Sequence, residues 1–277
     1  MTHFRSYLLL CIVLLNVSCD KKDSTDSQTI FQPFVETWYE LVNAFTDNQK
    51  IDEYCIKAWE AYQSDMPELA YSYIDDILDY REHWKPYAIK ATITYKKGRT
   101  DTERRMALGD YKKALKLNKN KETFKLNDTD SITYQLLYER MCRCTVNDNN
   151  ALIIIQKGLY EFPESTSLMN TMSLAYIHEK DYVLAEKWAK KVLEKDEILG
   201  CFRLAYLASK QDRHQEAIKY YEKCLELDPN YSSAKNNLAN SYRKVGRTDE
   251  ALQLFREAAR DGNAHSQNWL KNNGYTW

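Results

Sequence analysis

The chain has 277 residues, of which 44% are hydrophobic, so it is long enough to bury a sizeable core. Seven Gly and five Pro are few for this length, which argues against a β-sandwich or a loop-rich fold, whereas 21 Tyr suit helices that pack through large wedges. Lys and Arg number 39 against 40 Asp and Glu. Charges mixed in this way give no basic face, so nucleic-acid binding is not indicated.

Residues 1–18 have the features of an export signal. Arg5 precedes an apolar run from Tyr7 to Leu15, which is too short for a bilayer span of about 20 residues. A Val-Ser pair then precedes Cys19. This arrangement resembles the bacterial lipobox, in which the cysteine becomes lipidated and N-terminal after cleavage, with Asn16 where Leu is usual. The alternative is an ordinary secretory signal with an incidental cysteine.

Residues 19–29 form a polar tether, which we expect to be flexible because it has too few apolar side chains to pack. A charged run directly after the lipidated cysteine resembles the surface-export signals of Bacteroidetes lipoproteins. In enterobacteria, by contrast, Asp20 at this position resembles an inner-membrane retention signal. We favour an outer-membrane lipoprotein of a Gram-negative bacterium, facing the periplasm or the surface, that acyl chains rather than charge hold in place. The leaflet stays open.

Helical hairpins follow in order along the sequence. Apolar residues at helical spacing predict an N-terminal capping helix in residues 30–50, which Asp47-Asn48-Gln49 should end. Residues 51–84 and 85–120 predict two hairpins, the second less regular because its turn is longer. The polar stretch 118–130 is the predicted internal hinge.

Four more hairpins are predicted in residues 131–164, 165–198, 199–230 and 233–263. Their second helices align on small residues spaced 34, 32 and 34 apart: Ala151, Ala185, Ala217 and Ala251. Gly246, at the turn of the last hairpin, fits a helix end that needs a left-handed residue. A hairpin of this size cannot bury its apolar face alone, so we expect the hairpins to stack.

This pattern resembles the tetratricopeptide repeat (TPR) family over residues 51–277. The resemblance implies an all-α fold: a right-handed α-solenoid of antiparallel helix hairpins with terminal capping helices. Residues 264–277 should form the C-terminal cap, with Trp269 and Leu270 covering the end and the aromatic tail docking back.

Little in the sequence points to chemistry. No glycine-rich phosphate loop, nucleophile elbow or paired metal ligands appear, so we expect no enzyme, no cofactor and no metal site. Cys142 and Cys144 are two residues apart on a predicted helix and point to different sides. Five cysteines remain beyond the signal and the acyl site, and an odd number is a poor disulfide framework. A buried free thiol is the simplest interpretation of Cys224. The sequence leaves the thiol or disulfide state open for all five: Cys55, Cys142, Cys144, Cys201 and Cys224.

In TPR proteins the first helix of each repeat lines a concave groove. Carried over to the last repeat, this gives Asn236, Asn240 and Arg243 on one face, where amides suit a peptide backbone and Arg a carboxylate. The earlier repeats add Phe202, Tyr206 and Lys210, then Asn170, Leu174 and His178, then Leu136, Arg140 and Arg143. This mixture suits a peptide with acidic and hydrophobic residues. The alternative is that Asn236 and Asn240 simply occupy a polar helix face.

The leading functional hypothesis is a non-enzymatic, membrane-anchored TPR scaffold that binds a protein or peptide partner in its groove. One alternative is an accessory lipoprotein of outer-membrane assembly, although the repeats follow the plain 34-residue pattern. A second is a surface glycan-binding lipoprotein, which would need a large insert with exposed aromatics. The sequence predicts neither the partner nor the oligomeric state.

Overall fold

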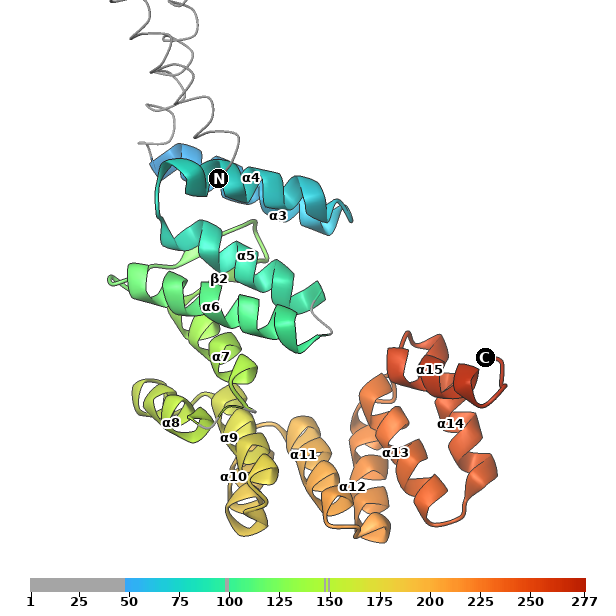
Figure 1. Cartoon of the computed structure of the whole chain (residues 1–277). Coiled ribbons are helices and arrows are strands. Elements are labelled where there is room, and N and C mark those ends of the chain that lie inside the picture. Colours follow the sequence, from blue (N-terminus) through green and yellow to red (C-terminus); the bar gives the residue numbers. More distant parts are fainter. Residues whose placement is uncertain (1–47, 98–99, 147, 149) are drawn as a thin grey trace, which may run out of the picture. The chain divides into compact units, whose positions relative to one another are not determined.

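The computed structural model describes residues 48–97, 100–146, 148 and 150–277. Within them the protein is all-α, with thirteen helices and one two-stranded β-ladder (Figure 1). It divides into an N-terminal unit that ends at Met141 and a C-terminal unit that begins at Cys142. The predicted signal peptide, Cys19, the tether and residues 30–47 lie outside the described residues.

Two helix hairpins make up most of the described N-terminal unit: α3 (Asn48–Gln63) with α4 (Pro67–Tyr80), and α5 (Trp84–Lys97) with α6 (Asp101–Leu117). Small side chains predicted to pack are buried between the helices: Ala58, Ala70, Ala88, Ala107 and Ala114. Asn48 and Gln49 are already helical, so they are not part of the break predicted there.

The polar stretch after α6 contains a β-hairpin. Phe124–Lys125 (β1) pairs antiparallel with Ser131–Ile132 (β2), and both Phe124 and Ile132 are buried. Asp130 accepts hydrogen bonds from Trp59 Nε1 at 3.3 Å and from Gln63 Nε2 at 3.2 Å, both on α3. The segment predicted as a hinge is therefore tied to α3. The hairpin predicted from residue 131 begins instead with a strand, and its first helix, α7, spans Tyr134–Cys144.

The C-terminal unit continues as α8 (Ala151–Glu161), α9 (Thr166–His178), α10 (Tyr182–Lys195), α11 (Glu197–Lys210), α12 (His214–Leu227), α13 (Ser232–Lys244), α14 (Thr248–Arg260) and α15 (Ala264–Asn272). Consecutive helices pack as the hairpins α9/α10, α11/α12 and α13/α14 (Figure 1). The four alanines that align on the second helices are buried: Ala151, Ala185, Ala217 and Ala251. The predicted all-α fold of antiparallel helix hairpins is confirmed.

Polar side chains fix several helix starts. Thr100, Ser165, Asp181, Asp196 and Asn263 each accept a hydrogen bond from the backbone N–H three residues further on. Each bond satisfies one of the N–H groups that have no partner within the helix, a contribution of about 1 kcal/mol. The helix boundaries therefore follow from local sequence as well as from packing.

The turns within the hairpins contain residues with a left-handed backbone conformation. Lys180 (φ 62), Asp212 (φ 57) and Gly246 (φ 85) follow α9, α11 and α13 respectively, and the prediction for Gly246 is confirmed. Between hairpins, α10 and α11 approach closely at Gly200. A Cβ placed there would lie 2.3 Å from the Cα of Leu193, closer than side chains tolerate, so this contact needs glycine.

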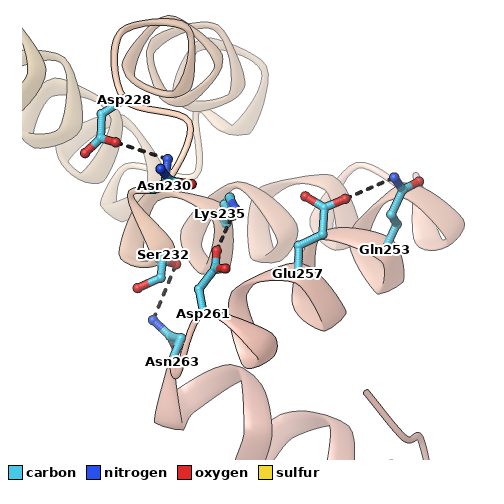
Figure 2. Close-up of polar contacts among 8 residues, drawn as sticks. All are labelled: Asp228, Asn230, Ser232, Lys235, Gln253, Glu257, Asp261 and Asn263. Atoms are coloured by element: carbon cyan, nitrogen blue, oxygen red, sulfur yellow. Dashed lines mark hydrogen bonds and ion pairs between the residues drawn. The ribbon is translucent and has the colours of Figure 1, made fainter.

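Helix α15 closes the C-terminal end. Trp269 stacks on Phe255 with ring centroids 4.1 Å apart, and Tyr275 stacks on Trp269, so the predicted docking of the tail is confirmed. Figure 2 shows the polar contacts beside this cap: Asn263 Nδ2 donates to the backbone O of Ser232 at 3.4 Å. In the same view, Lys235 Nζ lies 2.6 Å from the Asp261 carboxylate.

Candidate functional site

The first helices of three successive hairpins are neighbours in the C-terminal unit. Helix α9 contacts α11, and α11 contacts α13. These helices carry nine of the twelve residues that the sequence analysis assigned to the groove, and the other three lie on α7: Leu136, Arg140 and Arg143. The structure brings only some of those side chains together.

A cavity of about 170 Å³ lies where α11, α12 and α13 meet. Its lining side chains are polar or aromatic, and within the described residues none of them is a carboxylate: Tyr206, Ser209, Lys210, His214, Tyr221, Asn237, Asn240, Ser241 and Lys244. Three of these, Tyr206, Lys210 and Asn240, were predicted. The others belong to α12 or lie beside the predicted face.

Cationic and amide groups set the electrostatics of this cavity. Lys210 Nζ lies 5.1 Å from the ring centroid of Tyr206, a cation–π contact on one wall. Asn240 donates through Nδ2 to the backbone O of Asn236 at 3.0 Å, which leaves its Oδ1 as an acceptor. Lys244 is exposed at the rim. A ligand that carries negative charge and peptide-like polar groups would match these side chains.

Two buried polar atoms of the cavity make no hydrogen bond of normal geometry with the described residues: Tyr221 Oη and His214 Nδ1. Tyr221 is fully buried, and burial raises the pKa of its phenol, while hydrogen-bonding interactions with the Ser209 and Asn237 side chains lower it. The hydroxyl is therefore a neutral donor at ordinary pH. A buried polar group without a partner costs about 1–3 kcal/mol, so a ligand that pairs with one recovers that energy.

Two predicted residues are engaged in internal packing. Asn236 is buried, and its Oδ1 accepts a 2.9 Å hydrogen bond from Ser266 Oγ, which joins α13 to α15. Phe202 stacks on Tyr231 with centroids 4.9 Å apart and packs against the hydrophobic core. Both therefore support the site's scaffold and do not line the cavity.

Two other predicted residues are exposed and stand outside the cavity. His178 is the last residue of α9, and its Nδ1 lies 3.8 Å from the Glu179 carboxylate. Arg243 lies in the last turn of α13 and does not line the cavity. Neither contributes to the cavity described above.

Another predicted residue, Asn170, binds a side chain that the sequence analysis missed. Its Oδ1 accepts a 2.7 Å hydrogen bond from Nε of Arg203, whose residue is only 7% exposed. A signal was present in the sequence: Arg203 is the only charged residue from Ile198 to Ser209. A lone charge in such a stretch points either to a buried partner or to a ligand.

The arginines expected from the third repeat fall into different units. Arg140, in the N-terminal unit, donates to Thr92 Oγ1 at 2.7 Å. Arg143, in the C-terminal unit, donates to Ser167 Oγ at the start of α9 at 3.0 Å. Only Arg143 therefore belongs with the groove helices of the C-terminal unit.

The described residues lack the features of a metal site, a disulfide and a membrane-spanning helix. No group of three His, Cys, Asp or Glu side chains there is placed to hold a metal ion. The five described cysteines are free and buried, including Cys224 as predicted. Among the helices from α3 to α15, none has the length and apolar character needed to cross a bilayer.

Comparison with known proteins identifies a repeat family over this site. Residues 197–261, which contain α11, α12 and α13, match the sequence model of the tetratricopeptide repeat family. These residues are therefore similar in sequence to tetratricopeptide repeats. The helices that line the cavity therefore all come from the TPR-matched part of the sequence.

Curated relatives share part of the sequence. The uncharacterized protein ycf37 of Cyanophora paradoxa is 28% identical over 109 residues, covering 37% of this chain and 63% of that protein. The tetratricopeptide repeat-containing protein trd-1 of Caenorhabditis elegans is 31% identical over 93 residues, covering 33% of this chain and 12% of that protein. The chain therefore spans less than two thirds of either relative.

Among solved structures, a tetratricopeptide repeat protein from Parabacteroides merdae superposes with a TM-score of 0.54 at 17% identity, covering 77% of this chain and 80% of that one. At this identity the likeness concerns the fold alone. It supports a fold of TPR-type helix hairpins.

Proposed function

We propose that the protein is a non-enzymatic scaffold that binds an acidic, extended segment of a protein partner where α11 and α13 face the cavity. The observation that carries the proposal is the cavity's lining. Lys210 and Lys244 supply positive charge, and no described carboxylate of the lining neutralises it. A segment with Asp or Glu side chains would supply the missing charge.

The strength of such binding would not come from the lysines alone. An exposed ion pair contributes only about 0–1 kcal/mol, so Lys210 and Lys244 favour acidic ligands without fixing one. Pairing the buried Tyr221 hydroxyl and packing against Tyr206 would add more, because buried, desolvated contacts dominate interface energies. The Asn240 amide would fix the peptide backbone.

We further propose that the scaffold is held at the outer membrane of a Gram-negative cell by acyl chains on Cys19. The support is the export signal and lipobox-like sequence before this cysteine. Cys19→Ala is expected to move the protein from the membrane fraction to the soluble fraction. Cys11→Ala, within the signal, is the matched control and should stay in the membrane. A Cys19→Ala protein that remains membrane-bound would contradict lipid anchoring.

Partner binding is tested by a crosslinked pull-down of the full-length protein from native membranes. Wild type is compared with Lys210→Ala/Asn240→Ala, which removes one cation and one amide from the cavity. The control, Gln215→Ala/Lys219→Ala, removes the same chemistry from exposed positions of α12 outside the lining. A partner lost only from the cavity variant supports the proposal.

The other outcomes of the pull-down contradict the proposal that a partner binds at the cavity. A partner retained by both variants would place binding elsewhere on the protein. No partner in any sample would contradict the scaffold, and retention on immobilised polysaccharide would then favour glycan binding.

A further inference from the structure

His214 is the first residue of α12 and lines the cavity from the second helix of its hairpin. Its side chain is 18% exposed, and its Nε2 lies 3.5 Å from the carboxylate of Asp212, in the turn after α11. Its other ring nitrogen, Nδ1, is buried and makes no hydrogen bond of normal geometry with the described residues. Within that part of the structure the imidazole therefore has an acceptor beside one nitrogen only.

Protonation changes what this side chain needs from its surroundings. A neutral imidazole has one N–H donor and one acceptor, whereas an imidazolium donates from both nitrogens. On His214 the imidazolium would place an Nδ1–H donor where no described residue offers an acceptor, and a buried donor without a partner is unfavourable. An oxygen of a bound acidic segment would supply that acceptor. Protonation of His214 and binding at the cavity should therefore favour each other.

The helices that face His214 across the cavity contribute positive charge. Lys210 on α11 and Lys244 on α13 line the same cavity. The other titratable side chains of the lining are Tyr206 and Tyr221, which are phenols, and phenols as a class titrate well above neutral pH. Negative charge that enters the cavity would therefore lie near both lysines and the imidazole, and would favour the imidazolium in the complex.

The charged groups beside His214 in sequence act less directly. Asp212 contacts Nε2, but its side chain is 91% exposed, so solvent screens its charge. Arg213 and Glu216 pair with each other, with Nη1 2.6 Å from Oε2. A ligand carboxylate inside the cavity is therefore the charge that would change most between the empty and the occupied site.

We propose that His214 takes up a proton from solvent when an acidic segment binds in the cavity, so that affinity rises as the pH falls through neutrality. In the complex the imidazolium supplies a third positive charge beside the two lysines and an Nδ1–H that donates to an oxygen of the segment. Histidine suits this role because it ordinarily changes charge between about pH 5 and pH 8, where lysine stays charged. The inference rests on the proposed function, because it concerns the regulation of binding at the same cavity.

The test measures fluorescence anisotropy of labelled, C-terminally amidated hexaglutamate with the purified full-length protein from about pH 6 to about pH 8.5. Glutamate side chains ordinarily titrate at about pH 4.3, so the charge of the peptide stays constant over this range. Wild type should bind about three- to tenfold more tightly at the acidic end, the effect expected from one added charge in a partly solvated site. Calorimetry of wild type at neutral pH, in two buffers of different ionisation enthalpy, should show net proton uptake on binding.

Two variants fix the charge at position 214. His214→Gln is neutral and His214→Lys is positive over the whole pH range, so neither should show the pH dependence of wild type. His214→Gln should bind as wild type does at the alkaline end, and His214→Lys as wild type does at the acidic end. His178→Gln changes an exposed residue outside the cavity, and this control should retain the pH dependence of wild type.

A purely structural role of His214 predicts that both variants lose affinity together at every pH, and that result would overturn the inference. So would a His214→Gln protein that retains the pH dependence, or calorimetry that shows no proton uptake by wild type. If hexaglutamate binds independently of pH and Lys210→Ala/Asn240→Ala weakens it, the inference is refuted and the proposed function stands. No binding at any pH would contradict both.

Discussion

Gly200 allows α10 and α11 to approach, and replacing it with alanine should separate them. A Cβ at this position would meet three atoms of Leu193: Cα at 2.3 Å, and N and Cβ at 2.6 Å. Two of these are backbone atoms that no rotamer change can move. Ordinary van der Waals contact begins at 3.4 Å, so the helices would have to move apart by about 1 Å.

Two opposing effects determine how much Gly200→Ala changes the free energy of unfolding. Alanine in place of glycine within a helix stabilises it by about 1 kcal/mol. Overpacking a closed contact costs about 1–3 kcal/mol or more, and a backbone obstruction belongs at the upper end. We therefore expect Gly200→Ala to lower the free energy of unfolding by about 1–2 kcal/mol.

Gly109 provides a matched control, because it lies within α6 and a Cβ there would meet no atom within 4 Å. Gly109→Ala should therefore raise the free energy of unfolding by up to about 1 kcal/mol. Urea unfolding followed by circular dichroism measures both variants against wild type. A Gly200→Ala protein as stable as wild type would refute the close-approach argument.

Three further predictions concern stability. Hydrogen bonds hold the pKa of Asp130 below its ordinary value of 3.8. The ionised carboxylate therefore stabilises the fold above pH 3.8, and this stabilisation is lost as the pH falls through the lower pKa of the folded state. Asp130→Asn should be less stable at neutral pH and lose less stability on acidification, as urea titrations at several pH values will measure. Asn236→Ala should cost about 1–3 kcal/mol in thermal unfolding because it breaks the bond to α15, whereas Arg243→Ala should change stability by less than about 0.5 kcal/mol. Lys180→Gly should raise the unfolding midpoint by relieving about 1 kcal/mol of left-handed strain, and an unchanged midpoint would contradict this.

Repetition made the hairpins predictable. Stacked hairpins need small residues at fixed positions and left-handed turns between their helices. The spacing of Ala217 and Ala251 therefore predicted their burial, and Gly246 predicted a turn. The β-hairpin lacked such a signal, because its apolar residues are few and separated by polar ones. Those polar residues bond locally: Asn118 accepts from the N–H of Glu122 at 2.8 Å and donates to its carbonyl at 2.9 Å.

The candidate site was predictable only where helical spacing decides exposure. Tyr206 and Lys210 lie one turn apart on α11, and both line the cavity. Asn236 and Asn240 are also one turn apart, on α13, but Asn236 is buried by contacts with α15. Helical spacing alone does not predict burial by another helix. Helical spacing places Tyr221 in the core, where it is buried; its unpaired hydroxyl at the cavity wall is visible only in three dimensions.

The buried thiols have a consequence for how the protein must be made. In the folded protein, burial raises the pKa of Cys55 and Cys201, and that of Cys224 to about 12, so little reactive thiolate forms. An unfolded polypeptide has no such protection, because its thiols are exposed and titrate normally. Oxidative damage is therefore a competition between the rate of hairpin closure and the rate of thiol oxidation. Refolding yield should depend on a reductant, while the finished fold should keep its thiols in air.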